Sequence, residues 1–235
     1  MLQRFLVDPR RAGAYLGLAC LACAPRQPAA LVPETAAAVD RSQVGAWVSG
    51  SRPEGHRTIR FRWQLQDDRG AAGGRGSARV AGPDSVRLDV AGPLGAGRGS
   101  AVVIGDSARW TEPPDIIERL VPSYPLMWAM FGVERMPPEG AALRGSADSA
   151  AISWQWASGP DTVSYIRQRA PARLFAESRK GGRLVGRVET EIGPDGRPVT
   201  SRLTVPSVPA RLTLTFTGSA ASEPFATDLW RPDAP

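Results

Sequence analysis

The alternation of hydrophobic and polar positions predicts a protein built mainly from β-strands. In segment 58–66, apolar side chains occupy every second position between arginine and glutamine, as in a half-buried antiparallel strand. We expect about ten strands in all. The others fall in segments 77–81, 85–90, 99–104, 107–111, 152–156, 162–169, 171–177, 184–190, 199–205 and 212–216.

Turn residues separate these segments and predict short hairpin connections. Segment 70–76 is rich in glycine and reads as a turn, and Gly92-Pro93-Leu94-Gly95 reads as a tight turn between two strands. An antiparallel sheet of about ten strands must curl or close, because open edges invite unwanted pairing. The pattern therefore predicts a curved antiparallel sheet or an incomplete β-barrel.

Two segments have a helical pattern. Segment 33–41 combines helix-forming residues with Pro and Glu in the first turn, and this helix could continue to Val48. Segment 114–138 is rich in proline yet strongly apolar, with helical pieces at 114–120 and 126–131. We expect this helical flap to cover the sheet. Its apolar side chains fit either packing in the core or a surface that faces a ligand.

Charge and composition narrow the class of partner. The 235 residues carry a formal net charge of +6, and Lys180 is the only lysine, so arginine supplies almost all of the positive charge. These arginines lie between apolar residues, as on the solvent face of a strand. No basic run is interleaved with aromatic residues, so the sequence does not predict binding to nucleic acid.

The first 23 residues predict a bacterial lipoprotein signal. A basic start precedes a short apolar run that ends at Cys20-Leu-Ala-Cys23. Cys23 is the expected lipidated residue and Cys20 the alternative. We therefore expect a signal peptide at 1–23, a tether at 24–32 and one domain at 33–235. A thioredoxin-like Cys-x-x-Cys would need a preceding strand and a following helix, which a leader does not provide.

The reactive side chains do not form a catalytic motif. His56 is the only histidine, and no Gly-x-Ser-x-Gly sequence is present. Histidine and cysteine do not cluster as metal ligands would. The sequence therefore predicts a binding protein and not an enzyme, with no metal and no cofactor.

The order of elements resembles the LolA/LolB family of bacterial lipoprotein carriers and receptors, and LolB most. The resemblance lies in the strand at 86–90, the Pro93-Leu94-Gly95 turn, the strand at 100–104, and the helical segment ending near Pro125-Leu-Met-Trp128. It also includes a closing Leu-x-Leu-x-Phe strand at 212–216. The resemblance implies an incomplete barrel, closed by helices, that holds the acyl chains of a lipoprotein.

The same resemblance implies a location and partners. It implies a lipid-anchored protein on the periplasmic face of the outer membrane, where a LolA-type periplasmic carrier would deliver acylated lipoproteins or lipids. It also implies that Leu94, in the turn Pro93-Leu94-Gly95, inserts into the membrane. The alternative for Leu94 is that its side chain folds back onto the sheet.

An acyl chain would contact inward apolar residues. The candidates are Phe61, Trp63, Leu88, Met127, Trp128, Trp154 and Leu214. Each of them could instead be ordinary core. The leading hypothesis is therefore a carrier or receptor of acyl chains, and the alternative is a structural envelope lipoprotein with a packed barrel and no ligand.

Overall fold

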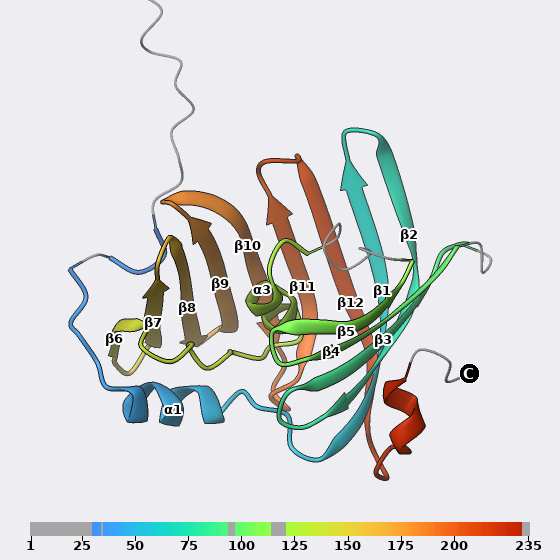
Figure 1. Cartoon of the computed structure of the whole chain (residues 1–235), viewed down its shortest axis with the longest axis horizontal. Coiled ribbons are helices and arrows are strands. Elements are labelled where there is room, and N and C mark those ends of the chain that lie inside the picture. The colour runs from blue at the N-terminus through green and yellow to red at the C-terminus, as the bar shows by residue number, and fades with distance from the viewer. Residues whose placement is uncertain (1–29, 34, 94–96, 114–120, 232–235) are drawn as a thin grey trace, which may run out of the picture.

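A single curved antiparallel sheet of twelve strands dominates the fold (Figure 1). The computed structural model describes residues 30–33, 35–93, 97–113 and 121–231. The strand order is β5-β4-β3-β2-β1-β12-β11-β10-β9-β8-β7-β6, so every neighbouring pair except β1 and β12 is also consecutive in sequence. The sheet is curved but does not close into a barrel, which confirms the predicted fold class.

The strands are long, and most match the predicted segments. They are β1 (His56–Asp67), β2 (Gly70–Ala81), β3 (Ser85–Ala91), β4 (Arg98–Ile104), β5 (Ser107–Glu112), β6 (Ala142–Ala147), β7 (Ala151–Ser158), β8 (Asp161–Arg169), β9 (Ala172–Lys180), β10 (Arg183–Ile192), β11 (Pro198–Val205) and β12 (Ala210–Ser222).

One expectation about the strands was wrong, and one strand was missed. Segment 70–76 is not a turn, because it forms the first half of β2 and pairs with β1 from Gly70 to Gly76. Segment 142–147 was not expected to be a strand, yet it forms the edge strand β6. Its sequence ALRGSA lacks a run of β-branched residues, so its propensity gives little signal.

The N-terminal helix begins later than predicted. Helix α1 spans Arg41–Ser49, so the prediction of a helix over 33–41 was wrong. The residues before α1 instead run along the edge of β6. The Val39 N–H donates to the Leu143 carbonyl at 3.3 Å, and the Gly145 N–H donates to the Ala37 carbonyl at 2.9 Å. Backbone pairing with β6 therefore outweighs the local helical preference of this alanine-rich segment.

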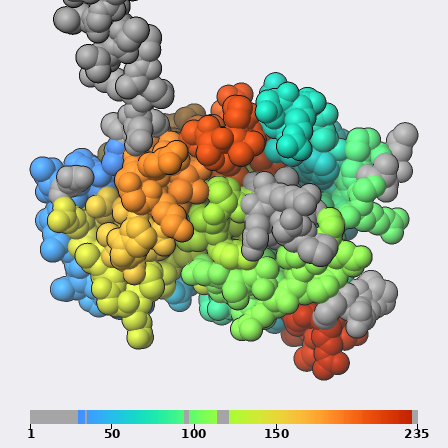
Figure 2. All heavy atoms as spheres, turned by 45° about the horizontal axis from the view of Figure 1, so that its top comes forward, coloured from blue at the N-terminus to red at the C-terminus, as the bar shows by residue number. Residues whose placement is uncertain are grey.

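Helix α3 (Tyr124–Met130) confirms the predicted helical piece at 126–131. It lies inside the curve of the sheet, between β4 and β5 on one side and β9 to β11 on the other (Figure 1). In Figure 2 the chain around α3, coloured lime, fills the space between the orange and the green strands. The hydrophobic core therefore forms around α3.

The C-terminal segment packs on the opposite, outer face of the sheet. It ends in the 3-10 helix η4 (Thr227–Trp230), and the guanidinium of Arg87 in β3 donates to the Leu229 carbonyl at 2.9 Å. Figure 2 shows this red segment against the green strands. It covers one part of the outer face.

Several expectations concern residues outside the described part of the chain. They are the signal peptide at 1–23 with Cys20 and Cys23, most of the tether at 24–32, the helical piece at 114–120, and Leu94 and Gly95 of the predicted insertion loop.

Candidate functional site: the helix-filled concave face

Helix α3 is short and apolar on all sides. Its chain enters at Ser123 in an extended conformation, Pro125 occupies the first turn, and Gly132 ends the helical region with a φ of 78°. Leu126, Met127, Trp128, Ala129 and Met130 are each at most 2% exposed. An all-apolar helix is stable only when its whole surface is covered. The sheet provides that cover.

Among the described residues, three hydrogen bonds attach α3 to the sheet at different points. The Trp128 indole N–H donates to the Gly105 carbonyl at 2.8 Å. The Ala108 N–H donates to the Tyr124 hydroxyl at 3.0 Å. On the opposite wall, the Thr190 hydroxyl donates to the Ala129 carbonyl at 2.8 Å. The helix is therefore positioned by a few polar contacts, and apolar packing supplies the rest of its binding to the sheet.

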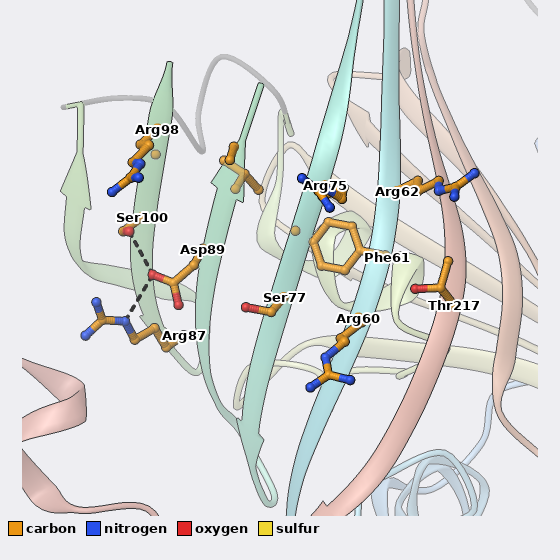
Figure 3. A pocket seen from close by; sticks show the side chains of 14 residues that line it. Arg60, Phe61, Arg62, Arg75, Ser77, Arg87, Asp89, Arg98, Ser100 and Thr217 are labelled. Atoms are coloured by element: carbon orange, nitrogen blue, oxygen red, sulfur yellow. Dashed lines mark hydrogen bonds and ion pairs between the residues drawn. The ribbon is translucent and has the colours of Figure 1, made fainter. Parts of the chain in front are cut away.

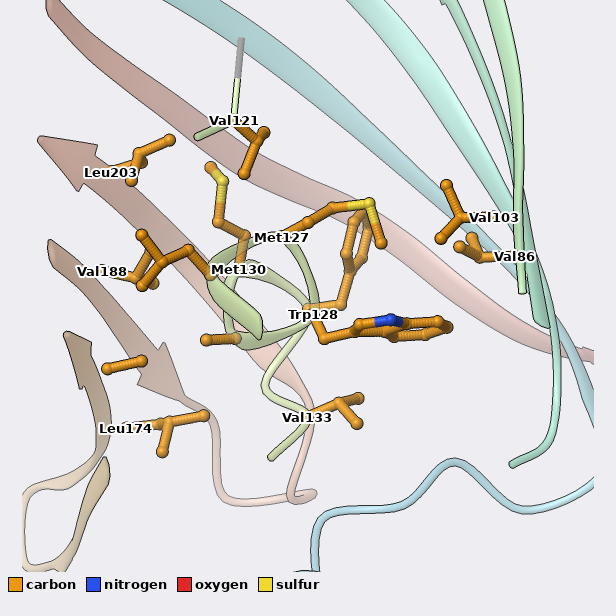
Figure 4. Packing of buried hydrophobic residues seen from close by; sticks show 14 of the residues in the cluster. Val86, Val103, Val121, Met127, Trp128, Met130, Val133, Leu174, Val188 and Leu203 are labelled. Carbon is orange, nitrogen blue, oxygen red and sulfur yellow. The ribbon is translucent and has the colours of Figure 1, made fainter. Parts of the chain in front are cut away.

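Side chains of α3 reach both walls of the curved sheet (Figure 4). Figure 4 shows the Trp128 ring extending toward Val86 and Val103, and Met130 lying on the side of Val188. All five belong to one hydrophobic cluster. Flexible methionines adapt to neighbours of different shape, so this interface can repack more easily than one built from β-branched residues.

An aromatic group closes the end of α3. Phe131 follows the helix and contacts Phe61 of β1 and Phe216 of β12, with ring centroids 6.0 and 5.9 Å apart. Phe61 and Phe216 lie 6.2 Å apart, and all three contacts are edge-to-face. Edge-to-face aromatic pairs at these distances contribute more stability than the burial of their apolar area alone would give.

The structure brings the seven acyl-chain candidates together on this concave face. Six are at most 8% exposed, and Trp63 is half-buried against the same cluster. Two of them, Met127 and Trp128, come from α3, and five come from the sheet. The seven residues are Phe61, Trp63, Leu88, Met127, Trp128, Trp154 and Leu214.

A buried polar cluster lies beside α3. The Glu134 carboxylate accepts from the Trp154 indole N–H at 3.0 Å and from Arg167 Nε at 2.9 Å. Burial raises the pKa of the Glu134 carboxyl, while the Arg167 guanidinium and the Trp154 N–H act in the opposite direction. Tyr165 stacks on Trp154 at 4.8 Å, and burial also raises the pKa of its hydroxyl. This cluster fixes the chain that leaves α3.

Sequence reasoning missed this polar cluster. Trp154 lies on β7, Arg167 on β8 and Glu134 in the connection after α3, and their sequence neighbours give no motif. The cluster forms because β7 and β8 pair, which places Trp154 opposite Tyr165 in the register. The available signal was the pair of charged residues, Glu134 and Arg135, within the apolar segment 121–137.

The remaining predicted site residues lie elsewhere. Pro93 is exposed at the tip of the hairpin between β3 and β4, where the Gly92 N–H donates to the Gly97 carbonyl at 2.9 Å. His56 begins β1 and packs against Phe225 with ring centroids 5.4 Å apart, away from α3. Within the described residues, no group of three or more His, Cys, Asp or Glu side chains could hold a metal ion.

No helix among the described residues combines the length and the apolar character needed to cross a membrane.

Comparisons by sequence find no match, either among family models or among curated proteins. Comparisons by structure do. A LolA superfamily protein from Nitrosomonas europaea aligns with 13% identity and a TM-score of 0.56, over 83% of this chain and 99% of its own. A putative outer membrane lipoprotein-sorting protein domain from Vibrio parahaemolyticus aligns with 11% identity and a TM-score of 0.54, over 81% of this chain and 95% of its own. The chain therefore has a LolA/LolB-like fold.

Proposed function

We propose that this chain is a lipid-anchored envelope protein that binds acyl chains of lipoproteins between α3 and the concave face of the sheet. One observation carries the proposal. The concave face is apolar along its strands, and what covers it is a short apolar helix that, within the described part of the chain, is attached through three hydrogen bonds. An acyl chain that displaces α3 would meet the same apolar surface that the helix now covers.

Burial of an acyl chain would offset part of the free-energy cost of displacing α3. Removing apolar surface from water contributes roughly 25 cal/mol per Å². An acyl chain on the concave face would recover most of the burial that α3 loses, so the cost of opening is partly offset by the ligand. The methionines of α3 favour this exchange because they repack without a fixed shape.

The fold supports a choice of cargo. One structural neighbour is described as a putative outer membrane lipoprotein-sorting protein domain. We therefore propose acylated lipoproteins as the cargo, a LolA-type periplasmic carrier as the donor, and the periplasmic face of the outer membrane as the location. Cys23 would carry the lipid anchor, with Cys20 as the alternative, and Leu94 would contact the membrane.

The test uses the chain from Ala24 onward, which contains every described element and lacks the predicted anchor. Native mass spectrometry should show a one-to-one complex with a diacylated lipopeptide and none with the same peptide without acyl chains. Binding should also change tryptophan emission. That change should be smaller in Trp128→Phe, which alters α3, and kept in Trp110→Phe, which alters the far side of the sheet near Arg87.

Equal binding of the acylated and the acyl-free peptide, or of neither, would contradict the proposal. Failure to bind either would favour a structural envelope lipoprotein, because α3 then serves as permanent core. The complete burial of Trp128 and Leu126 is the observation that supports this alternative.

A further inference from the structure

The outer face of the sheet carries an open depression of about 690 Å³, on the side opposite α3 (Figure 3). It extends over β12, β1, β2, β3 and β4, and small residues such as Gly76, Ala91 and Gly99 form part of its lining. Four exposed arginines line it as well, and we call the whole feature the arginine groove. These four are Arg60, Arg62, Arg75 and Arg98.

The four arginines have no acidic partner among the described residues. Arg62 and Arg75 stand directly opposite each other on β1 and β2, so two like charges face the same strip of surface. Like charges in that arrangement destabilise a sheet. The Arg62–Arg75 pair therefore lowers the stability of the sheet. Such a pair is not expected on a surface whose role is folding alone.

Among the described residues that line the groove, the one acidic side chain, Asp89, is already engaged. Asp89 accepts hydrogen bonds from Arg79 at 2.8 Å, from Arg87 at 3.3 Å and from Ser100 at 2.8 Å. Figure 3 shows the contacts of Asp89 with Arg87 and Ser100, with the four groove arginines spread around them on β1, β2 and β4. The groove therefore presents a net positive field.

We propose that the arginine groove binds the phosphate groups of anionic phospholipid headgroups at a membrane surface. A guanidinium donates two parallel hydrogen bonds to phosphate oxygens, which a compact ammonium cannot do. A basic surface is also attracted to an anionic leaflet over about one Debye length. A headgroup phosphate between Arg62 and Arg75 would convert their repulsion into two favourable contacts.

The topology favours a headgroup over an acidic polypeptide. All five strands beneath the groove are paired on both sides, so a peptide cannot add to the sheet there by backbone hydrogen bonding. Recognition depends on side chains alone. Small anionic groups can be bound in an open depression by side chains alone, without backbone pairing. The C-terminal segment held by Arg87 covers the neighbouring part of this face and leaves the four arginines exposed.

This inference goes beyond the proposed function and does not depend on it. The groove and α3 lie on opposite faces of the sheet, so their variants separate the two activities. Loss of headgroup binding should leave binding of acylated peptide intact, and Trp128→Phe should leave headgroup binding intact.

The test is sedimentation of the chain from Ala24 onward with vesicles of phosphatidylglycerol and phosphatidylcholine, and with vesicles of phosphatidylcholine alone. We expect binding to the anionic vesicles only, weakening as salt rises. The double variant Arg62→Gln/Arg75→Gln should lose about 25-fold in vesicle affinity, since each arginine near an anionic surface contributes roughly fivefold. Arg62→Lys/Arg75→Lys should keep more binding than the glutamine pair.

The matched control is Lys180→Gln/Arg183→Gln, which removes two exposed positive charges that stand opposite each other on β9 and β10 and should bind like the parent chain. The glutamine double variant should unfold at the same or a higher denaturant concentration, because it removes a like-charged pair. Equal loss of vesicle affinity in Lys180→Gln/Arg183→Gln would show that net charge alone sets the affinity, and it would overturn the proposal.

Two further experiments identify which kind of molecule supplies the anionic group that the groove binds. Inorganic phosphate at millimolar concentration should compete weakly, because a free ion lacks the multiple contacts of a surface. Complete competition by phosphate would assign the groove to a free anion. Binding of polyglutamate with no binding to anionic vesicles would assign it to an acidic polypeptide. Either result would overturn the membrane proposal.

Discussion

At the scale of single residues, Glu134 is a carboxylate that the fold has buried beside α3. Its ion pair with Arg167 lowers the cost of that burial, yet desolvation is the larger effect, so its pKa is raised. A raised pKa means that folding favours the protonated form. The stability that Glu134 contributes is therefore present below its pKa in the unfolded chain and is lost as the pH rises through its pKa in the folded protein.

We predict a pH-dependent effect of Glu134→Gln. Glutamine keeps an acceptor for the Trp154 N–H and does not titrate. The free energy of unfolding of the parent chain, relative to that of the variant, should therefore be largest below about pH 4 and should decline as the pH rises above that value. Urea denaturation at several pH values measures it. If the stability of the parent chain relative to Glu134→Gln instead grows with pH, then the attraction of the Glu134 carboxylate to Arg167 outweighs the cost of burying its charge.

At the scale of elements, the glycines of β2 explain why the sequence misled. Segment 70–76 has turn composition, but Gly76 lies opposite Phe61 in the register, and a Cβ placed there would lie 2.4 Å from the Phe61 ring. A strand glycine often marks such a close approach. Here the large aromatic residue on β1 occupies the space that a side chain on β2 would need.

We predict that Gly76→Ala lowers the free energy of unfolding by about 1–3 kcal/mol through overpacking against Phe61. The matched control is Gly218→Ala in β12, where no atom lies within 4 Å of the added Cβ. It should change stability by less than about 0.5 kcal/mol. Chemical denaturation of both variants measures the difference. Equal changes in the free energy of unfolding would show that strand propensity, and not contact with Phe61, determines the effect.

Most elements could be predicted from periodicity because the strands are half-buried and alternate clearly. The failures have physical causes. Segment 33–41 has helical composition, but pairing with β6 gives its backbone other partners. Strand β6 itself has weak propensity and is defined by its pairing with β7. Long-range pairing of this kind leaves no local signal.

The site was predictable in part. Alternation identified Phe61, Leu88, Trp154 and Leu214 as inward residues, and the structure places them around α3. The sequence did not reveal that arginines from three strands converge on one depression. Alternation assigns each to the solvent face, but only the strand order and register show which ones become neighbours.

At the scale of the whole molecule, the open sheet has an edge at β6 that needs a cover. Residues 36–39 supply it through the contacts of Ala37, Ala38 and Val39 with β6. An uncovered edge presents free N–H and C=O groups to other chains. The segment before α1 therefore protects the sheet as well as connecting to it.

We predict that a chain beginning at Asp40 self-associates more than a chain beginning at residue 30. Removing 30–39 exposes the backbone groups of Leu143 and Gly145. Sedimentation velocity over a range of concentrations measures the difference. Identical behaviour of the two chains would show that β6 is too short or too polar to pair with another copy.

The strand order also has a kinetic consequence. Strands β1 to β5 form one meander and β6 to β12 another, and each grows by pairing sequence neighbours. The seam between β1 and β12 joins the two ends of the domain along the full length of β1. Closing that seam requires the largest loop, so it carries the greatest entropic cost. Each meander can therefore form early, and the rate at which the protein reaches its native state should depend on the seam.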